Sequence, residues 1–142
     1  NLGSADALEM GNLPYTILQE HIEQEAMTHF KPEVWARFTH RVVYRQLPYD
    51  VQVDICKKML AEELERQSKK VGAKLIAGSG TFRFLVARGF TEQLGARLMR
   101  NAVEYYVRGA LVDSILAGNR PKPGATYAIA LKGEKLVLAL AA

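Results

Sequence analysis

Two arginines stand in short motifs whose residue types could do chemistry, and the first of them is Arg97. It follows Gly95 and Ala96 at the expected start of a long helix. A guanidinium is always charged, and its planar fork binds carboxylate or phosphate oxygens through paired hydrogen bonds. A cation at a helix N-terminus is opposed by the helix dipole. Arg97 therefore has little local structural justification, which favours a functional role.

The second arginine, Arg37, lies in an aromatic segment. Trp35 and Phe38 flank it, and Glu33 stands four residues earlier. A purely structural interpretation is open here, because the guanidinium could stack on a ring or pair with that glutamate. The residue types alone do not choose between this interpretation and a role in binding.

Other reactive groups give weaker signals. Cys56 is the only cysteine, which excludes an internal disulfide and a multi-cysteine metal site. The three histidines, His21, His29 and His40, do not stand at metal-ligand spacing with a cysteine or carboxylate cluster. The sequence has no Gly-x-x-x-x-Gly-Lys-Ser/Thr loop to cradle phosphates, and no apolar strand that ends in Asp-Glu to hold magnesium.

The composition suits a small globular domain with an attached segment. The chain has 142 residues, 49% of them apolar, and a net charge of +4. No apolar run approaches the ~20 residues of a membrane span, and the first residues do not resemble a signal peptide. Basic residues alternate with acidic ones, which is typical of a solvated helix face and not of a nucleic-acid surface. We therefore expect no membrane and no nucleic acid as partners, and a reducing, cytoplasmic location.

The periodicity of apolar residues predicts an α+β fold in two parts. In the first part we expect a helix over 16–30 with a capping box from Thr16 to Gln19, then a short helix over 33–38 and a strand or an extended exit over 41–45. Leu47-Pro48 marks a boundary, and the 46 residues before it are too few to hold a core of their own. The second part should alternate as helix, strand, helix, helix, strand, strand, with these ranges: 49–70, 74–77, 81–88, 96–117, 125–131 and 134–140. On the long helix 96–117, six residues stand at core spacing and should pack inside: Val103, Tyr105, Tyr106, Val107, Leu111 and Ile115.

Four stretches, in one order and at one spacing, resemble the C-terminal ATPase module of Clp-type unfoldases and disaggregases of the AAA+ class. They are Asn1-Leu2-Gly3-Ser4, Phe30-Lys31-Pro32-Glu33-Val34-Trp35-Ala36-Arg37, Gly89-Phe90 with Gly95-Ala96-Arg97, and Leu116-Ala117-Gly118. Each is weak alone, and their common register carries the resemblance. The chain departs from the family pattern at Ala36, Phe38-Thr39-His40, Leu98 and Asn101, which indicates a divergent branch.

The resemblance implies roles for particular residues. Residues 1–46 would end an AAA+ large subdomain, and residues 47–142 would form its small lid domain with a short three-stranded sheet. Arg97, beside Ala96, would be the sensor-2 residue that contacts nucleotide phosphates in its own subunit. Arg37 would be the arginine finger for the neighbouring subunit, and Asn1 the sensor-1 group that orients the attacking water.

The resemblance also implies cofactors and partners. ATP and Mg²⁺ would be bound mainly by residues outside this chain, so the chain alone should not hydrolyse ATP. The full-length protein would be a homohexamer acting on unfolded or aggregated proteins, with a protease ring or a chaperone as a further partner. The alternative function is a non-catalytic oligomerisation or regulatory module derived from an AAA+ lid.

Overall fold

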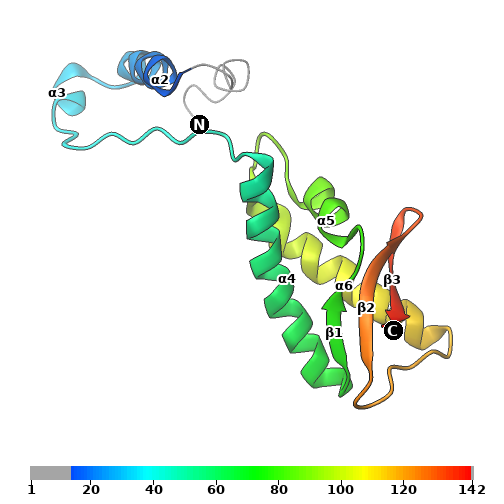
Figure 1. Ribbon diagram of the computed structural model, residues 1–142. Helices are drawn as coiled ribbons and strands as arrows, with labels where there is room; N and C mark the ends of the chain where they lie inside the picture. The colour runs from blue at the N-terminus through cyan, green and yellow to red at the C-terminus, as the bar shows by residue number, and fades with distance from the viewer. Residues whose placement is uncertain (1–13, 142) are drawn as a thin grey trace. The chain divides into compact units, whose positions relative to one another are not determined.

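A computed structural model describes residues 14–141, which fall into two compact units divided between Leu47 and Pro48. The first unit contains the helices α2 (Tyr15–His29) and α3 (Pro32–Trp35), followed by an extended segment without a strand partner (Figure 1). The second unit contains the remaining elements. Each unit is described by itself below.

Side chains, not a sheet, hold the extended segment of the first unit. The Tyr15 hydroxyl donates to the Val43 carbonyl at 3.1 Å, and the Arg41 guanidinium lies 3.7 Å from the Glu23 carboxylate. Of the two alternatives left open for 41–45, the segment is therefore the extended exit and not a strand. Its β-branched residues have the composition of a strand, but no neighbouring strand is present in the described part of this unit to complete a ladder.

The capping box predicted at the start of this unit is wrong. Helix α2 begins one residue earlier, after Pro14, and no side chain caps its N-terminus. The Gln19 amide donates to Glu23 at 2.8 Å, one turn along the helix, and not back to Thr16. Pro14 sets an extended backbone before the helix, which places the helix start ahead of the predicted cap.

The second unit has the α+β architecture that the sequence predicts. Its helices are α4, α5, a 3₁₀ turn η1 and α6, and its sheet has strands β1, β2 and β3. The bounds are α4 Tyr49–Val71, β1 Lys74–Ala77, α5 Thr81–Gly89, η1 Ala96–Leu98, α6 Met99–Leu116, β2 Thr126–Lys132 and β3 Lys135–Leu140. The helix predicted over 96–117 differs in one respect, because its first turn is 3₁₀ and the α-helix proper starts at Met99.

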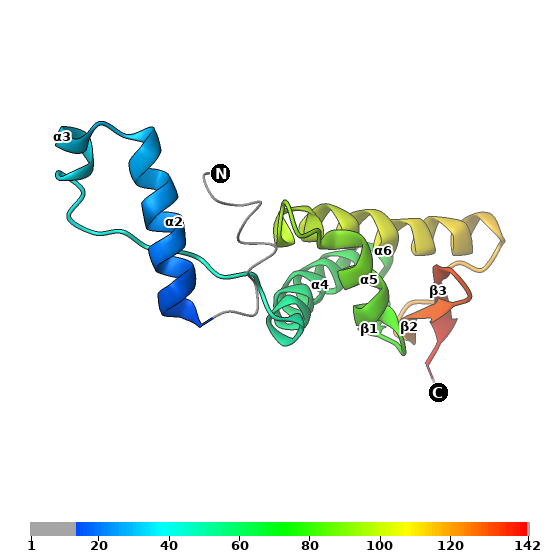
Figure 2. The same ribbon diagram turned by 90° about the horizontal axis from the view of Figure 1, so that it is seen from above.

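The three strands form one mixed sheet in the order β1-β2-β3. Strand β1 pairs in parallel with β2, and β2 pairs antiparallel with β3 across the predicted hairpin. The parallel pair requires a crossover, which α5, η1 and α6 supply. The sheet lies along one side of the helices, as Figure 2 shows.

The core joins α4, α5 and α6 to one face of the sheet. Its most buried members include Leu60, Leu85, Val103, Val107 and Ile129. Burying a side chain of this size contributes roughly 1.5–3 kcal/mol each. Within residues 14–141, no helix has the length and apolarity needed to cross a membrane.

Helix α6 is buried along one stripe, but less broadly than its sequence predicts. Val103, Val107 and Leu111 are buried as expected. Tyr105 is 74% exposed and Ile115 is 37% exposed, so their predicted places in the core are wrong. Tyr105 stands two residues from both Val103 and Val107, about 200° around the helix, so its side chain faces away from the buried stripe.

A buried carboxylate ties α4 to α6. Glu63 is 2% exposed; its carboxylate accepts hydrogen bonds from Arg66 and from the Gln67 amide at 2.7 Å within α4, and from Arg108 of α6 at 3.1 Å. Glu104 of α6 pairs with the same two arginines, at 3.0 Å from Arg66 and 2.9 Å from Arg108. Burial alone would raise the pKa of Glu63, but the three hydrogen-bond donors outweigh it and hold that pKa below its usual value.

We predict that Glu63→Gln destabilises the domain by about 2 kcal/mol, because an amide cannot pair with both guanidiniums. This destabilisation is smaller than that from breaking a fully buried ion pair, because the side chains of Arg66 and Arg108 are both nearly half exposed. The folded pKa of Glu63 is lowered. The ionised Glu63 carboxylate therefore contributes fully to the free energy of unfolding above the pKa of about 4.3 that it has in the unfolded chain. This contribution is lost as the pH falls through the lower pKa of the folded state. Urea unfolding at pH 7 and at successively lower pH measures both effects.

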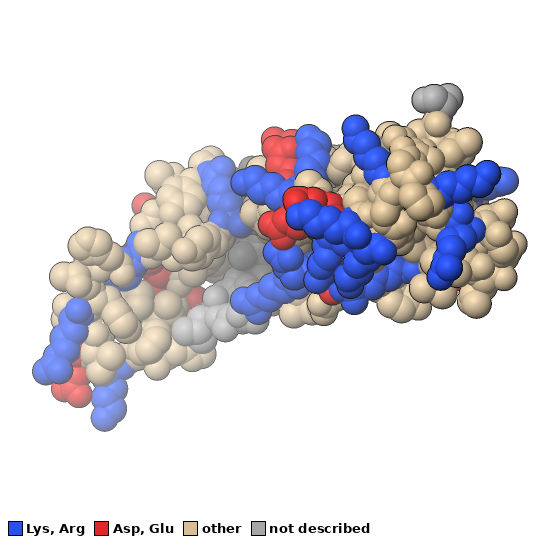
Figure 3. Space-filling model, turned by 90° about the horizontal axis from the view of Figure 1, so that it is seen from below, with Lys and Arg blue, Asp and Glu red and all other residues tan. Residues whose placement is uncertain are grey.

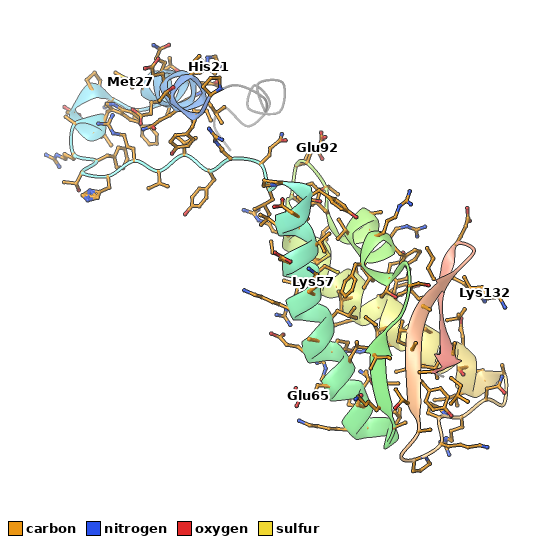
Figure 4. The ribbon with its side chains drawn as sticks, viewed as in Figure 1. His21, Met27, Lys57, Glu65, Glu92 and Lys132 are labelled. Atoms are coloured by element: carbon orange, nitrogen blue, oxygen red, sulfur yellow. The ribbon has the colours of Figure 1, made fainter. Side chains whose placement is uncertain are left out.

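The matched control is Glu65→Gln on the same helix. Glu65 is exposed and pairs with Lys69 at 2.6 Å, so this variant should unfold close to the parent chain. Figure 4 shows Glu65 pointing away from the other helices. Equal destabilisation by the two variants would contradict a structural role for the buried carboxylate.

Candidate functional site

The turn between α5 and α6 positions Arg97. Thr91 and Gly95 exchange two backbone hydrogen bonds, of 3.2 and 2.7 Å, and the Thr91 hydroxyl accepts a third at 3.1 Å from the Leu94 amide. These bonds close the loop into a tight hairpin, whose position is marked by Glu92 in Figure 4. The chain leaves the loop directly into the η1 turn that carries Arg97.

Two glycines of this motif have different structural tasks. Gly95 has φ +59° and ψ −139°, a backbone conformation that side chains with a Cβ rarely adopt. Gly89 ends α5, where a Cβ atom would lie 2.7 Å from the Met99 Cα at the start of α6. The first glycine shapes the turn, and the second lets α5 abut α6. Together they fix where Arg97 leaves the fold.

The side chain of Arg97 is exposed and unpaired within residues 14–141. Its backbone amide donates to the Leu94 carbonyl at 3.3 Å, while the guanidinium makes no hydrogen bond or ion pair there. Ala96 is half-buried and packs on the core, which anchors the turn on the other side. By contrast Arg100, one turn further, pairs with Glu62 of α4 at 3.0 Å. The arrangement presents one free guanidinium on a fixed backbone, which suits an anionic ligand.

Arg37 lies in the first unit, just after α3. Its amide donates to the Val34 carbonyl at 3.1 Å, and its side chain is exposed without a hydrogen bond or ion pair to any residue from 14 to 141. The structural interpretation of Arg37 gains no support, because Arg41 occupies the face of Trp35, with its guanidinium 4.8 Å from the ring centroid. Phe30, Trp35 and Phe38 pack against one another, with ring centroids 5.4 to 6.1 Å apart.

The four predicted site residues do not all lie in one place. Ala96 and Arg97 stand together on the η1 turn, Arg37 belongs to the other unit, and Asn1 lies outside the described residues. In the described range 14–141, no three His, Cys, Asp or Glu side chains gather where they could hold a metal ion.

Sequence reasoning missed Glu63. The alternating charges of α4 predict exposed pairs three or four residues apart, and Lys57–Asp54 and Lys69–Glu65 are of that kind. Glu63 belongs to the same pattern and yet is buried. The available signal is a second oppositely charged pair on α6, because Glu104 and Arg108 at i, i+4 can meet Glu63 and Arg66 at i, i+3 on α4.

An α+β unit with this element order, and with a Gly-Ala-Arg turn between two of its helices, has the features expected of the small domain of a Clp-type ATPase. A family described as the C-terminal, D2-small domain of ClpB protein matches residues 47–129. This chain belongs to that family.

Named relatives agree with the family. The chain is 33% identical over 111 residues to chaperone protein ClpC3, chloroplastic, of Oryza sativa subsp. japonica, covering 76% of this chain and 12% of that protein. It is 28% identical over 105 residues to a probable ATP-dependent Clp protease ATP-binding subunit of Chlamydia pneumoniae, covering 74% and 12%. With chaperone protein ClpB of Vibrio vulnificus (strain YJ016) the identity is 28% over 123 residues, covering 84% and 14%. The chain thus spans 12–14% of the length of these relatives.

We predict that Gly95→Ala destabilises the domain by about 1–3 kcal/mol, because a Cβ atom is strained in this backbone conformation. The matched control is Gly109→Ala. Gly109 lies inside α6 with no atom within 4 Å of the position of a new Cβ, and alanine should stabilise the helix there by roughly 0.5–1 kcal/mol. Opposite signs in chemical denaturation are the expected result, and equal effects would contradict the assigned role of Gly95.

Proposed function

We propose that this chain is the C-terminal part of an ATP-dependent Clp-type unfoldase or disaggregase. Residues 1–46 then end the large AAA+ subdomain and residues 47–142 form its lid. The family match over 47–129 supports the lid assignment, and the relatives named as chaperones and as ATP-binding subunits support the activity. The division between Leu47 and Pro48 agrees with such an organisation.

The free guanidinium of Arg97 carries this proposal. In ATP hydrolysis, charge accumulates on the oxygens of the leaving γ-phosphoryl group, and catalysis consists mostly of positioning and of fixed positive charge. Arg97 contacts the nucleotide phosphates of its own subunit as sensor 2. Ala96 keeps the turn against the core, so the backbone from which the Arg97 side chain extends is fixed before the nucleotide arrives. A preorganised charge stabilises the transition state without reorganisation at the moment of reaction.

The other roles extend the same proposal. Arg37 acts as the arginine finger of the neighbouring subunit, and Asn1 orients the attacking water. ATP and Mg²⁺ are held mainly by residues that this chain does not contain, so the chain alone is inactive. The full-length protein is a cytoplasmic homohexamer that acts on unfolded or aggregated proteins, together with a protease ring or a chaperone.

We predict that Arg97→Ala in the full-length protein lowers ATP turnover about 100-fold, because one preorganised donor to the transition state is lost. Arg97→Lys should recover only part of this rate, since an ammonium keeps the charge but not the planar fork. Steady-state ATPase assays measure both. The control is Arg83→Ala, which removes another exposed arginine of this unit. Unchanged turnover in Arg97→Ala would exclude the sensor role and favour a non-catalytic module.

We predict a different signature for Arg37→Ala. A finger acts on the neighbouring subunit's nucleotide, so turnover in the assembled ring should fall by roughly 10³-fold or more. The assembly itself and nucleotide affinity should change little. Sedimentation, nucleotide titration and ATPase assays separate these quantities. Arg41→Ala is the matched control, because Arg41 stacks on Trp35 within its own unit. Full activity in rings of Arg37→Ala would refute the finger assignment.

A further inference from the structure

A groove runs between the C-terminal halves of α4 and α6. It consists of two adjoining depressions of about 310 and 420 Å³, which share Lys70, Val71 and Ile115. The first continues along α6 to Arg108, and the second continues into the loop after α6 at Arg120. This groove is distinct from the turn that carries Arg97, since it involves the opposite end of α6.

The floor of the groove is apolar and accessible. Val71, Leu111, Val112 and Ile115 line it, with two prolines of the following loop at one end. Val112 is 52% exposed and Ile115 is 37% exposed. Exposed aliphatic side chains gathered in a concave surface are typical of an interaction site. The sequence places Ile115 in the core, yet the residues from 14 to 141 leave more than a third of it exposed.

The rim of the groove is basic. Lys70, Arg108 and Arg120 line it, and no aspartate or glutamate does. Arg108 is occupied by Glu63 and Glu104, whereas the side chains of Lys70 and Arg120 have no hydrogen bond or ion pair with the residues from 14 to 141. In Figure 3, which views the molecule from the side at which α4 ends, blue Lys and Arg side chains cover more of the visible face than red Asp and Glu side chains.

The shape selects the kind of occupant. Helices α4 and α6 run in the same direction, since Glu62 pairs with Arg100 and Arg66 with Glu104. A groove between two such helices accepts a third helix, whose ridge of side chains fits between them. The lining from Arg108 to Ile115 spans about two turns, or roughly 11 Å. A concave apolar floor fits a helix better than a flat membrane or a nucleic acid without apolar side chains.

We infer that this groove binds an acidic amphipathic helix of a partner protein. Aliphatic residues of the partner at positions i, i+3 or i+4, and i+7 cover Val112 and Ile115. Flanking aspartate or glutamate side chains pair with Lys70 and Arg120, the two rim cations that lack a partner. The inference does not depend on the nucleotide role of Arg97.

The test uses the 142-residue chain and two synthetic helical peptides with identical leucine faces, one flanked by glutamate and the other by lysine. Fluorescence anisotropy measures their affinity for the parent chain and for Lys70→Glu/Arg120→Glu. We expect the glutamate peptide to bind the parent chain and to lose roughly tenfold or more in affinity to the variant. The lysine peptide should show the reverse preference. Val112→Ser should weaken both peptides, because it removes apolar contact.

The matched control is Lys132→Glu/Lys135→Glu, which makes the same change in charge on the β2–β3 hairpin; Figure 4 labels Lys132 there. It should leave the affinity within about twofold. Absence of binding by the glutamate peptide, or equal losses in the two double variants, would overturn the proposal. So would binding of anionic vesicles or single-stranded DNA that depends on Lys70 and Arg120 while the glutamate peptide does not bind.

Discussion

The buried carboxylate of Glu63 is the constraint on which the second unit depends. An ionised group in a dry environment is costly unless opposite charges and hydrogen bonds surround it. Arg66 and Gln67 meet it from α4, and Arg108 from α6. A slip of α6 by one turn would leave the carboxylate without Arg108 and would also separate Arg66 from Glu104. The network therefore selects one register for two helices whose remaining contacts are aliphatic and less directional.

That register divides the cations of the domain into two groups. The cations of one group form ion pairs with carboxylates of the same domain; they are Lys57, Arg66, Lys69, Arg100 and Arg108. The other group, with Arg97, Lys70 and Arg120, has no such partner within residues 14–141. Surface pairs contribute little to stability, but they neutralise charge locally. Arg97 before the start of α6, and Lys70 and Arg120 beside its end, are thus among the cations whose charge the ion pairs of the fold do not neutralise.

Much of this fold could be predicted from the sequence because its signals are local. Apolar periodicity and Gly72 locate α4, and the apolar runs on either side of Gly133 locate the β2–β3 hairpin. The errors and the open alternatives arise where distant residues decide. The composition of segment 41–45 suits a strand or an extended exit, and the described part of its unit holds no partner strand that would make it a strand. The exposure of Ile115 depends on what the rest of the chain leaves uncovered. Glu63 resembles its exposed neighbours until α6 is placed against it. At the candidate site, the motif itself contains the glycines of the turn that carries Arg97. The motif does not show which cations pair with carboxylates in the folded domain, and so it could not predict that Arg97 has no such partner within residues 14–141.

Helix α6 joins the two exposed cationic regions through the buried network. Arg97 precedes its first residue, Arg108 pairs with Glu63 and Glu104 with Arg66 near its middle, and the groove includes its last turns. Eighteen residues span about 27 Å, and a continuous helix with a buried ion network in its centre resists bending. Any displacement imposed on the Arg97 end is therefore transmitted to the groove as motion of the whole domain, and not as a change in the groove's shape. A ligand at one end can alter where the groove is presented, while its affinity for an acidic helix stays set by Lys70, Arg120 and the apolar floor between them.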